Sequence, residues 1–308
     1  MATKVLLTGG TGFLGRALEK QLRVGGYDVV ALGSSDCDLI DFEATLTTFG
    51  AIQPDVVLHA AAVTGGIGIC SEKPATLFHQ NTSMLLHVLE AARIAKATHF
   101  VGIGSSCAYP GDRWGDLSEE ELWNGGLHPS VEGFGVTKRI TEAGLRAYQK
   151  EFGLRTQFPI LANLYGEHDN FDLDSSHVLA ALVRRFVEAA EEGAAAVTCW
   201  GSGSPIREFL YVDDAAEGVV KLMETPVSQP INIGSGAGIT IRDLVGEIVR
   251  LTGFKGEIHW DTDRPDGSPR KVLDVRHMKN LMDWRPQTAL SEGLERTIAW
   301  YRQSRASG

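Results

Sequence analysis

The chain contains 308 residues, of which 43% are hydrophobic and 22% are charged, and it carries a formal net charge of −10. This length and composition are typical of a globular protein with an extensive core and two lobes. The acidic excess opposes binding to nucleic-acid phosphates and anionic membranes, so we expect neither as a partner. No run approaches the roughly 20 apolar residues of a membrane span, and no leader pattern precedes the first strand, so we expect a cytoplasmic protein.

The cysteines occur without a CxxC pair and without a histidine at the spacing of a zinc site. We therefore predict free thiols in a reducing compartment and no metal centre. Three of them are interpreted as packing or surface thiols: Cys37, Cys70 and Cys199. His59 and His99 are interpreted as residues at strand ends.

Short β-branched runs alternate with longer helical patterns in the first half of the chain. The expected strands are Lys4–Thr8, Asp28–Leu32, Val56–His59, His99–Ile103 and Thr156–Leu161. One expected helix repeats apolar residues every four positions, at Leu14, Leu18 and Leu22. Another is expected to line one face with Leu85, Leu86, Leu89 and Ala92. Strands separated by helices in this rhythm predict an α/β fold with a Rossmann doubly wound parallel sheet.

This rhythm changes after about Leu164. A loop rich in Asp and Asn leads to a helix expected over His177–Glu192 and a strand over Val197–Trp200. Residues 231–236, INIGSG, predict a strand and a glycine turn, and residues 263–274, DRPDGSPRKVLD, predict a loop. We expect a smaller C-terminal α/β lobe whose chain returns to the first. The predicted domains are 1–164 with about 210–237, and about 165–209 with 238–308.

A glycine-rich segment, TGGTGFLG at residues 8–15, follows the first expected strand and opens a helix. It fits both GxGxxG and GxxGxxG. The glycines allow a tight turn, close approach of the backbone to a pyrophosphate, and close packing of helix on strand. The N-terminus of the helix supplies free N–H groups and a positive dipole for the anion. We therefore predict cofactor contacts from Gly9, Thr11, Gly12, Phe13, Leu14 and Gly15.

The end of the second strand, ALGSS at residues 31–35, carries no acid before Asp36. An NAD enzyme usually places Asp or Glu here to hold the ribose 2′-hydroxyl. Its absence removes repulsion toward a 2′-phosphate, to which Ser34 and Ser35 can donate, although no Arg is present. We predict NADP as the cofactor, with NAD as the alternative. Asp38, with Leu39, is expected either at the adenine edge or as a helix cap.

Further motifs follow one another along the chain. They are SSCAYP at 105–110, FGVTK at 134–138, NLYGEHDNF at 163–171, SSHV at 175–178, WGSGSPIREF at 200–209 and DGSPRK at 266–271. In this order and spacing, over nearly the whole chain, they strongly resemble the GDP-L-fucose synthase family of extended short-chain dehydrogenases/reductases. The resemblance implies NADPH-dependent 3,5-epimerisation and 4-reduction of a GDP-4-keto-6-deoxy sugar. It also implies an NADP-binding first domain, a nucleotide-sugar-binding second lobe, and a homodimer formed through helices of the first lobe.

The resemblance also implies roles for individual residues. Ser105 and Lys138 become members of the reductase triad, and Cys107 and His177 become the acid–base pair that epimerises C3 and C5. Ala60 and Lys138 join the cofactor contacts. The implied substrate contacts are Asn163 near the sugar, and Arg185, Trp200, Ser204, Arg207 and Lys271 at the nucleotide diphosphate.

The chemistry of this pair can be weighed from the residue types. A 4-ketone acidifies the hydrogens on both neighbouring carbons, so one base and one acid on opposite faces suffice to invert them. A cysteine is a suitable base where a nearby cation or helix end stabilises its thiolate. A histidine can return the proton at neutral pH. Cys107 and His177 are therefore the expected catalytic pair.

One position departs from the family pattern. The reductase triad requires Tyr four residues before Lys138, one helical turn away, and Phe134 stands there. A phenyl ring cannot donate a proton, so we expect impaired reduction and slower epimerisation. Two interpretations stay open: an introduced Tyr-to-Phe substitution in an otherwise complete site, or a natural variant that no longer reduces. Alternative functions are an epimerase alone, an enzyme for a heptose or another nucleotide, and an NADP-holding redox sensor.

Overall fold

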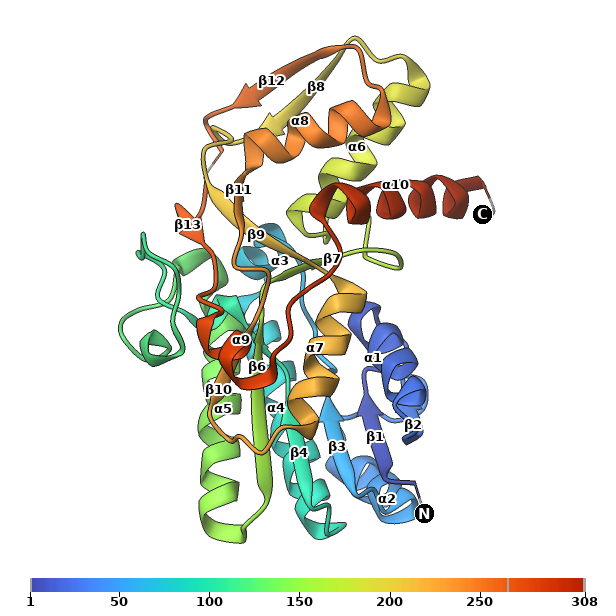
Figure 1. Cartoon of the computed structure of the whole chain (residues 1–308), viewed down its shortest axis with the longest axis vertical. Coiled ribbons are helices and arrows are strands. Elements are labelled where there is room, and N and C mark those ends of the chain that lie inside the picture. The colour runs from blue at the N-terminus through green and yellow to red at the C-terminus, as the bar shows by residue number, and fades with distance from the viewer. Residues whose placement is uncertain (1, 265, 307–308) are drawn as a thin grey trace.

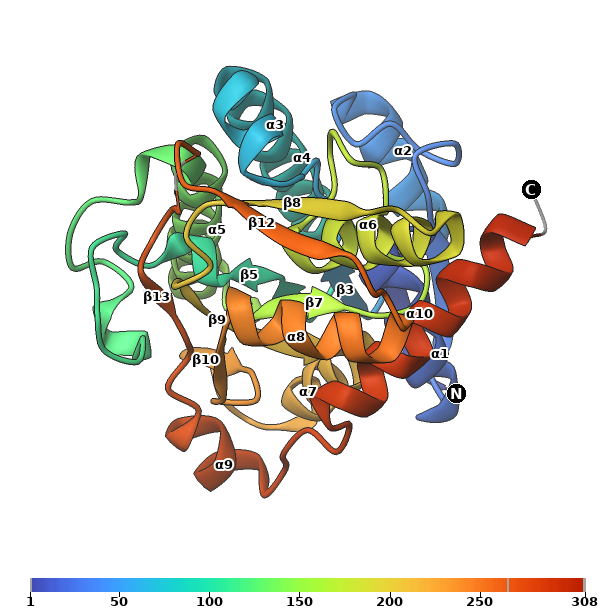
Figure 2. The ribbon, with the colours of Figure 1, turned by 90° about the horizontal axis from the view of Figure 1, so that it is seen from above.

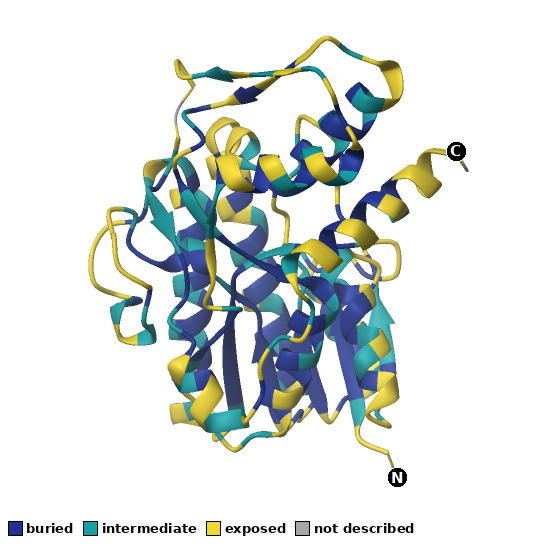
Figure 3. Ribbon diagram, turned by 45° about the horizontal axis from the view of Figure 1, so that its top comes forward, coloured by how far each residue is buried: buried dark blue, intermediate teal, exposed yellow. Residues whose placement is uncertain are grey.

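A computed structural model of the chain describes residues 2–264 and 266–306. Figure 1 shows two lobes: a parallel sheet with helices on both sides in the lower half, and a smaller α/β lobe above it. Most strands of the lower sheet are buried, the edge strand Asp28–Leu32 being the exception, whereas the helices expose one face (Figure 3). This pattern explains the near-continuous apolar runs of the expected strands, because a parallel sheet is covered on both faces.

The first sheet is entirely parallel, in the order β10-β6-β4-β3-β1-β2, with β5 paired to β6. Its strands are β1 Lys4–Thr8, β2 Asp28–Leu32, β3 Val56–His59, β4 His99–Gly102, β5 Gly104–Ser105, β6 Arg155–Leu161 and β10 Pro230–Ile233. The strand order reverses between β1 and β3, the position at which ligands bind in open α/β sheets. The predicted Rossmann fold is confirmed, and so is the return of the chain to the first lobe, through β10.

Helices cover both faces of this sheet (Figure 2). They are α1 Phe13–Val24, α2 Phe42–Ile52, α3 Ile67–Glu72, α4 Pro74–Ile94, α5 Glu132–Phe152 and α7 Val212–Glu224. α1 packs against α7, and α4 packs against both α2 and α5. Leu85 and Leu89 are buried as expected, but Leu86 is 52% exposed, so its assignment to the same face is wrong. Adjacent helical residues point in different directions, and Leu86 faces away from the core.

The second lobe contains a four-stranded sheet and a two-stranded sheet. The first comprises β7 Asn163–Tyr165, β9 Ile206–Tyr211, β11 Gly238–Thr240 and β13 Arg270–Lys271, and the second pairs β8 Ala196–Trp200 with β12 Glu257–Asp261. The remaining helices are α6 Val178–Glu192, α8 Ile241–Thr252, α9 Arg276–Met282 and α10 Leu290–Ala306. The expected loop over residues 263–274 is wrong in one respect: Arg270–Lys271 pairs in parallel with β9.

Each lobe has its own apolar core, and one segment of the later chain belongs to the first. α6, α8 and α10 pack around the second core, whose largest fully buried side chains include Tyr165 and Phe186. Met278 and Trp284 instead pack into the first core. Residues around α9 therefore lie with the Rossmann lobe, although the predicted division placed 238–308 in the second lobe. Among the described residues, no helix combines the length and apolar character needed to cross a bilayer.

Candidate active site

The loop between β1 and α1 leaves no room for side chains at its glycines. A Cβ on Gly15 would lie 1.9 Å from the carbonyl oxygen of Gly9, and one on Gly9, at φ +71°, would lie 2.7 Å from the backbone of Ala61. The N-cap of α1, Gly12, offers no side chain to the first helical turn. The open N–H groups and positive dipole at this helix end fit the pyrophosphate of a dinucleotide.

A pocket of about 580 Å³ lies at the end of β2, and Ser34, Ser35 and Asp38 are among its lining residues. The Asp38 carboxylate accepts the N–H of Ile40 at 2.9 Å. The cap of α2 is Asp41, whose side chain accepts the N–H of Ala44, so the alternative of Asp38 as a helix cap is wrong. None of the described residues that line this pocket is Lys or Arg.

The remaining predicted cofactor residues lie around the same loop. Thr11 packs so closely on the end of β2 that a Cβ on Gly33 would lie 2.6 Å from its hydroxyl oxygen. Ala60 follows β3 and donates its N–H to the carbonyl of Thr8 at 3.2 Å. Leu39 is buried, and two residues of α1 pack against the first core: Phe13 and Leu14.

Lys138 and Phe134 lie one turn apart on α5, beneath the ends of β4 and β5. The Lys138 ammonium is buried and donates to the carbonyl of Ile103 at 3.0 Å. Burial lowers the pKa of Lys138 to about 8, although Cys107 raises it in part. The Phe134 ring centroid lies 5.3 Å from the Lys138 nitrogen, within the range of a cation–π contact. The phenyl ring therefore lies next to the ammonium but offers it no hydroxyl.

Cys107 lies in the short 3₁₀ helix η1, Ser106–Ala108, which follows β5 directly. The Ser105 hydroxyl oxygen caps this turn by accepting the N–H of Cys107 at 3.2 Å. The ammonium of Lys271, in β13, lies 3.7 Å from the Cys107 sulfur. β13 pairs with β9 so that Lys271 lies opposite Arg207. The structure thus brings three predicted residues together from distant parts of the sequence: Cys107, Arg207 and Lys271.

His177 is the N-cap of α6, so the helix begins at Val178, one residue later than expected. The segment before it is anchored on the loop that precedes α3, where the carbonyl of Ser175 accepts the N–H of Gly66 at 3.0 Å. The His177 side chain is exposed to solvent, although many protein atoms lie close around it. This crowding lowers the pKa of its imidazole, and the positive charge of Lys271 lowers it further.

The predicted nucleotide contacts form two groups. Arg207 donates to the carbonyls of Ile206 at 2.9 Å and Asp266 at 3.3 Å, and burial lowers the pKa of its guanidinium. The second group contains Arg185 and Trp200: the guanidinium carbon of Arg185 lies 5.6 Å from the ring centroid of Trp200.

The two smaller predicted substrate residues are held by neighbours. The Ser204 hydroxyl lies 2.6 Å from that of Ser202. The Asn163 amide donates to the carbonyl of Glu208 at 2.8 Å, so this side chain fixes β7 on β9.

Two further side chains lie near the predicted substrate residues and were missed from the sequence. Arg264 lies over the other predicted aromatic contact, 5.1 Å from the Trp200 ring centroid. His128 has its imidazole held by Ser130 at 2.7 Å, and its pKa is lowered by burial and then by Lys271 and Arg207. A lone histidine in a loop carries no pattern that separates it from a surface residue.

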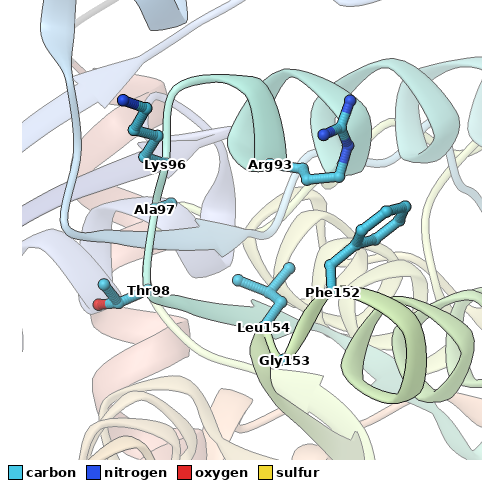
Figure 4. Close-up of a pocket in the computed structure, with 7 residues that line it drawn as sticks. All are labelled: Arg93, Lys96, Ala97, Thr98, Phe152, Gly153 and Leu154. Atoms are coloured by element: carbon cyan, nitrogen blue, oxygen red, sulfur yellow. The ribbon is translucent and has the colours of Figure 1, made fainter.

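A second pocket, of about 270 Å³, lies at the opposite edge of the first sheet, where α4 and α5 end. Figure 4 shows Arg93 and Phe152 facing one another across it, with the guanidinium carbon 4.9 Å from the ring centroid. Arg93 is already paired with Glu90 at 2.6 Å. None of the predicted site residues lines this pocket.

The cysteines interpreted from the sequence as packing thiols, and His59, are buried. Cys37, Cys70 and Cys199 are buried free thiols. His59, at the end of β3, bonds to the hydroxyl of Thr8 at 2.8 Å, and burial lowers its pKa to about 3. Among the described residues, no group of three or more His, Cys, Asp or Glu side chains is arranged to hold a metal ion.

The model of the NAD dependent epimerase/dehydratase family matches residues 5–234. The chain belongs to this family. A probable GDP-L-fucose synthase of Oryza sativa subsp. japonica is 37% identical over 97% of this chain and 92% of its own length. The GDP-L-fucose synthase of Escherichia coli strain K12 is 35% identical over 98% of this chain and 97% of its own length. These relatives confirm the resemblance predicted from the motifs.

Solved structures have the same architecture. A GDP-6-OMe-4-keto-L-xylo-heptose reductase from Campylobacter jejuni superposes with a TM-score of 0.92 at 25% identity, covering 98% of both chains. A GDP-L-fucose synthetase from Naegleria fowleri bound to NADP superposes with a TM-score of 0.90 at 26% identity, covering 99% of this chain and 94% of the other.

We expect the chain to bind NADP more tightly than NAD. In the β2 pocket, the hydroxyls of Ser34 and Ser35 can donate to a 2′-phosphate. Removing both hydroxyls (Ser34→Ala with Ser35→Ala) should weaken NADP binding by roughly 1–3 kcal/mol, because each hydrogen bond contributes about 0.5–1.5 kcal/mol. NAD binding should change little. Calorimetric titration of both cofactors measures this, and tighter binding of NAD than of NADP would contradict it.

We expect Arg207→Ala to weaken binding of GDP, used as a probe of the nucleotide end, by about 1.5–3 kcal/mol, the contribution of a charge-assisted contact. Arg250→Ala is the matched control, because Arg250 lies on α8 and pairs with Glu247. Calorimetry with GDP gives both dissociation constants. If Arg207→Ala left the constant unchanged, Arg207 would not contact the diphosphate.

Proposed function

We propose that the protein is an NADPH-dependent epimerase and reductase of a GDP-4-keto-6-deoxyhexose, like its GDP-L-fucose synthase relatives. The observation that carries the proposal is the contact of the Lys271 ammonium with the Cys107 sulfur at 3.7 Å, with His177 and the buried Lys138 ammonium near enough to interact electrostatically with this pair. A thiol and an imidazole in one cleft, at the carboxyl edge of a nucleotide-binding sheet, suit proton transfer at carbons next to a ketone.

In the epimerisation, Cys107 acts as the base. Its thiolate takes a proton from the carbon next to the ketone: the C–H bond breaks, an S–H bond forms, and the electron pair moves onto the ketone oxygen as an enolate. The imidazolium of His177 then gives a proton to the opposite face of that carbon. The lowered pKa of His177 makes its imidazolium a stronger donor, and its access to solvent allows reprotonation between the two inversions.

For the reduction, the glycine loop, Ser34 and Ser35 would hold NADPH, which supplies a hydride to C4 when bound. Ser105 and Lys138 lie at the strand ends where the ketone oxygen is expected. Phe134 has no proton to give that oxygen, so we propose that reduction is impaired. One missing donor typically costs about 3 kcal/mol, or roughly 10²–10³ in rate. The same loss slows epimerisation, because the enolate oxygen lacks that hydrogen bond.

An epimerase that no longer reduces is the second candidate function. The Phe134 ring is 7% exposed and packs in an apolar cluster with Cys70, Leu77 and Val131. A phenyl ring is therefore well accommodated here. Both residues assigned to epimerisation, Cys107 and His177, are present, and Cys107 packs against this cluster.

At the nucleotide end we propose that Arg207, Arg185 and Ser204 bind the diphosphate and that the Trp200 ring packs on the nucleotide. Trp200 is 57% exposed and is flanked by Arg185 and Arg264, an open aromatic surface between two cations. Asn163 is proposed near the sugar. The sugar itself is proposed to be a hexose, with a heptose as the alternative, since solved neighbours include a heptose reductase.

We also propose a cytoplasmic homodimer formed through α4 and α5. α4 exposes Phe78 and Leu86, at 42% and 52%, on the side turned away from the first core. Burying such residues against a second copy removes apolar area from water.

Leu86→Glu should therefore shift the chain toward monomer, because it places a carboxylate in that interface. Sedimentation velocity measures this, with Val24→Glu on the exposed face of α1 as the control. An unchanged sedimentation coefficient for Leu86→Glu would place any dimer interface elsewhere.

Reduction and epimerisation are assigned to different residues, so variants of those residues test the two steps separately. Phe134→Tyr should raise NADPH oxidation on a GDP-4-keto-6-deoxyhexose by roughly 10²–10³, because it returns a proton donor beside Lys138. Cys107→Ser or His177→Asn should abolish deuterium exchange at C3 and C5 in D₂O and leave NADP binding unchanged. Mass spectrometry reports the exchange, and absorbance at the NADPH band reports reduction.

The outcomes separate the candidates. Exchange without reduction in Phe134→Tyr would favour the epimerase that no longer reduces. Neither exchange nor reduction in any variant would overturn the substrate assignment.

A further inference from the structure

The ammonium of Lys271 contacts the sulfur of Cys107 at 3.7 Å, and no other hydrogen-bond or ion-pair partner of this ammonium occurs among the described residues. The resemblance assigns Lys271 to the nucleotide diphosphate together with Arg207. Its position instead directs it toward the thiol that is proposed to act as the base. The two assignments predict different reactivity of the Cys107 thiol in the absence of substrate.

The backbone that carries Lys271 is fixed from both sides. On one side, β13 pairs with β9. On the other, the residues that follow pair with Leu117, whose N–H donates to Val272 at 2.8 Å and whose carbonyl accepts the N–H of Asp274 at 2.9 Å. Next to it, the N–H of Leu273 donates to the buried carboxylate of Glu208 at 2.7 Å. The long Lys271 side chain therefore starts from a rigid base.

The turn that carries Cys107 is equally constrained. Ser105 caps it, and the guanidinium of Arg139 donates to the carbonyl of Ala108 at 2.8 Å. α5 approaches so closely that a Cβ on Gly135 would lie 2.3 Å from the Cys107 carbonyl oxygen. Two fixed backbones thus hold the ammonium and the sulfur against one another without any help from a ligand.

Other charged and titratable groups also lie near the sulfur, and two of them are cations that interact electrostatically with it, Lys138 and Arg207. Lys138, from α5, donates to Ile103. Arg207, from β9, donates to two backbone carbonyls. His177, from the start of α6, and His128 both have lowered pKa values, which favours their neutral forms. Cys70, from α3, is buried, and burial raises its pKa to about 11, so it stays a thiol.

We propose that Lys271 is a positioning residue for Cys107: its ammonium pairs with the thiolate form of the sulfur when Cys107 acts as a base, rather than binding the diphosphate. The inference rests on the proposed function only for the use of that thiolate as a base. An opposite charge in contact favours the ionised form of a thiol. The pairing itself is a property of the substrate-free protein.

The test measures the reactivity of Cys107 without substrate. Iodoacetamide alkylates thiolates, and mass spectrometry of the Cys107 peptide gives the rate at pH 7.5. Lys271→Met should lower this rate about tenfold, the effect of one unit in thiol ionisation. Lys271→Arg should recover most of it, because the charge returns. Lys150→Met, at the exposed end of α5, is the matched control and should match the unaltered chain.

Binding of GDP to the same variants supplies the second readout. Lys271→Met should leave the GDP dissociation constant within about twofold, whereas Arg207→Ala raises it. If Lys271→Met left the alkylation rate unchanged and weakened GDP binding, the proposal would be overturned. Lys271 would then be assigned to the diphosphate. Lys271→Gln tests the same point if Lys271→Met does not fold, as judged by circular dichroism. Because no sugar is used, a failure here is separate from a failure of the proposed reaction.

Discussion

The carboxylate of Glu208 joins three stretches of chain at the junction of the two lobes. It lies on β9, is 1% exposed, and accepts the N–H groups of Leu273 at 2.7 Å and Gly236 at 2.8 Å. Burial raises its pKa, and these donors oppose that shift. A buried carboxylate is tolerated only where donors replace its water. Here the donors come from the turn after β10 and from the strand segment at β13, so satisfying one charge fixes both segments on β9.

This arrangement determines where the cations of the cleft lie. Successive side chains of a strand point to opposite faces, so Arg207 points away from the side to which Glu208 turns. The parallel register then places Lys271 beside Arg207, at the carboxyl edge of the first sheet. The chain as a whole carries a net charge of −10. The junction of the two lobes therefore concentrates positive charge locally in a chain whose overall charge is negative.

The regular parts of this structure were predictable from the sequence because their causes are local. β1, β2 and β3 have the expected bounds, since each is an apolar run bounded by turn residues. The glycine loop was predictable for the same reason. β13 was not, because a two-residue strand among prolines and glycines has no pattern of its own and exists through its pairing with β9.

Contacts between distant segments were beyond the reach of the sequence. The motifs predicted Cys107 and Lys271 separately, 164 residues apart, but gave no distance between them. His128 and Arg264 were missed for a related reason: the neighbours of each are distant in the sequence, Lys271 and Arg207 for His128 and Trp200 for Arg264. Leu86 was assigned to the wrong helix face, because four apolar residues in eight do not all fit on one face.

Lys138 shows what Phe134 changes in the site. A buried ammonium has three protons to donate, and only the carbonyl of Ile103 accepts one within the described residues. The adjacent ring compensates through its face, at 5.3 Å from the nitrogen, which is a weaker partner than a hydroxyl oxygen. Burial lowers the pKa of Lys138 to about 8. A phenol at the same position would accept from the ammonium and donate to a ketone, linking the buried charge to the reacting oxygen. Phenylalanine cannot make this link, whereas the buried ammonium of Lys138 stays in place beside Cys107.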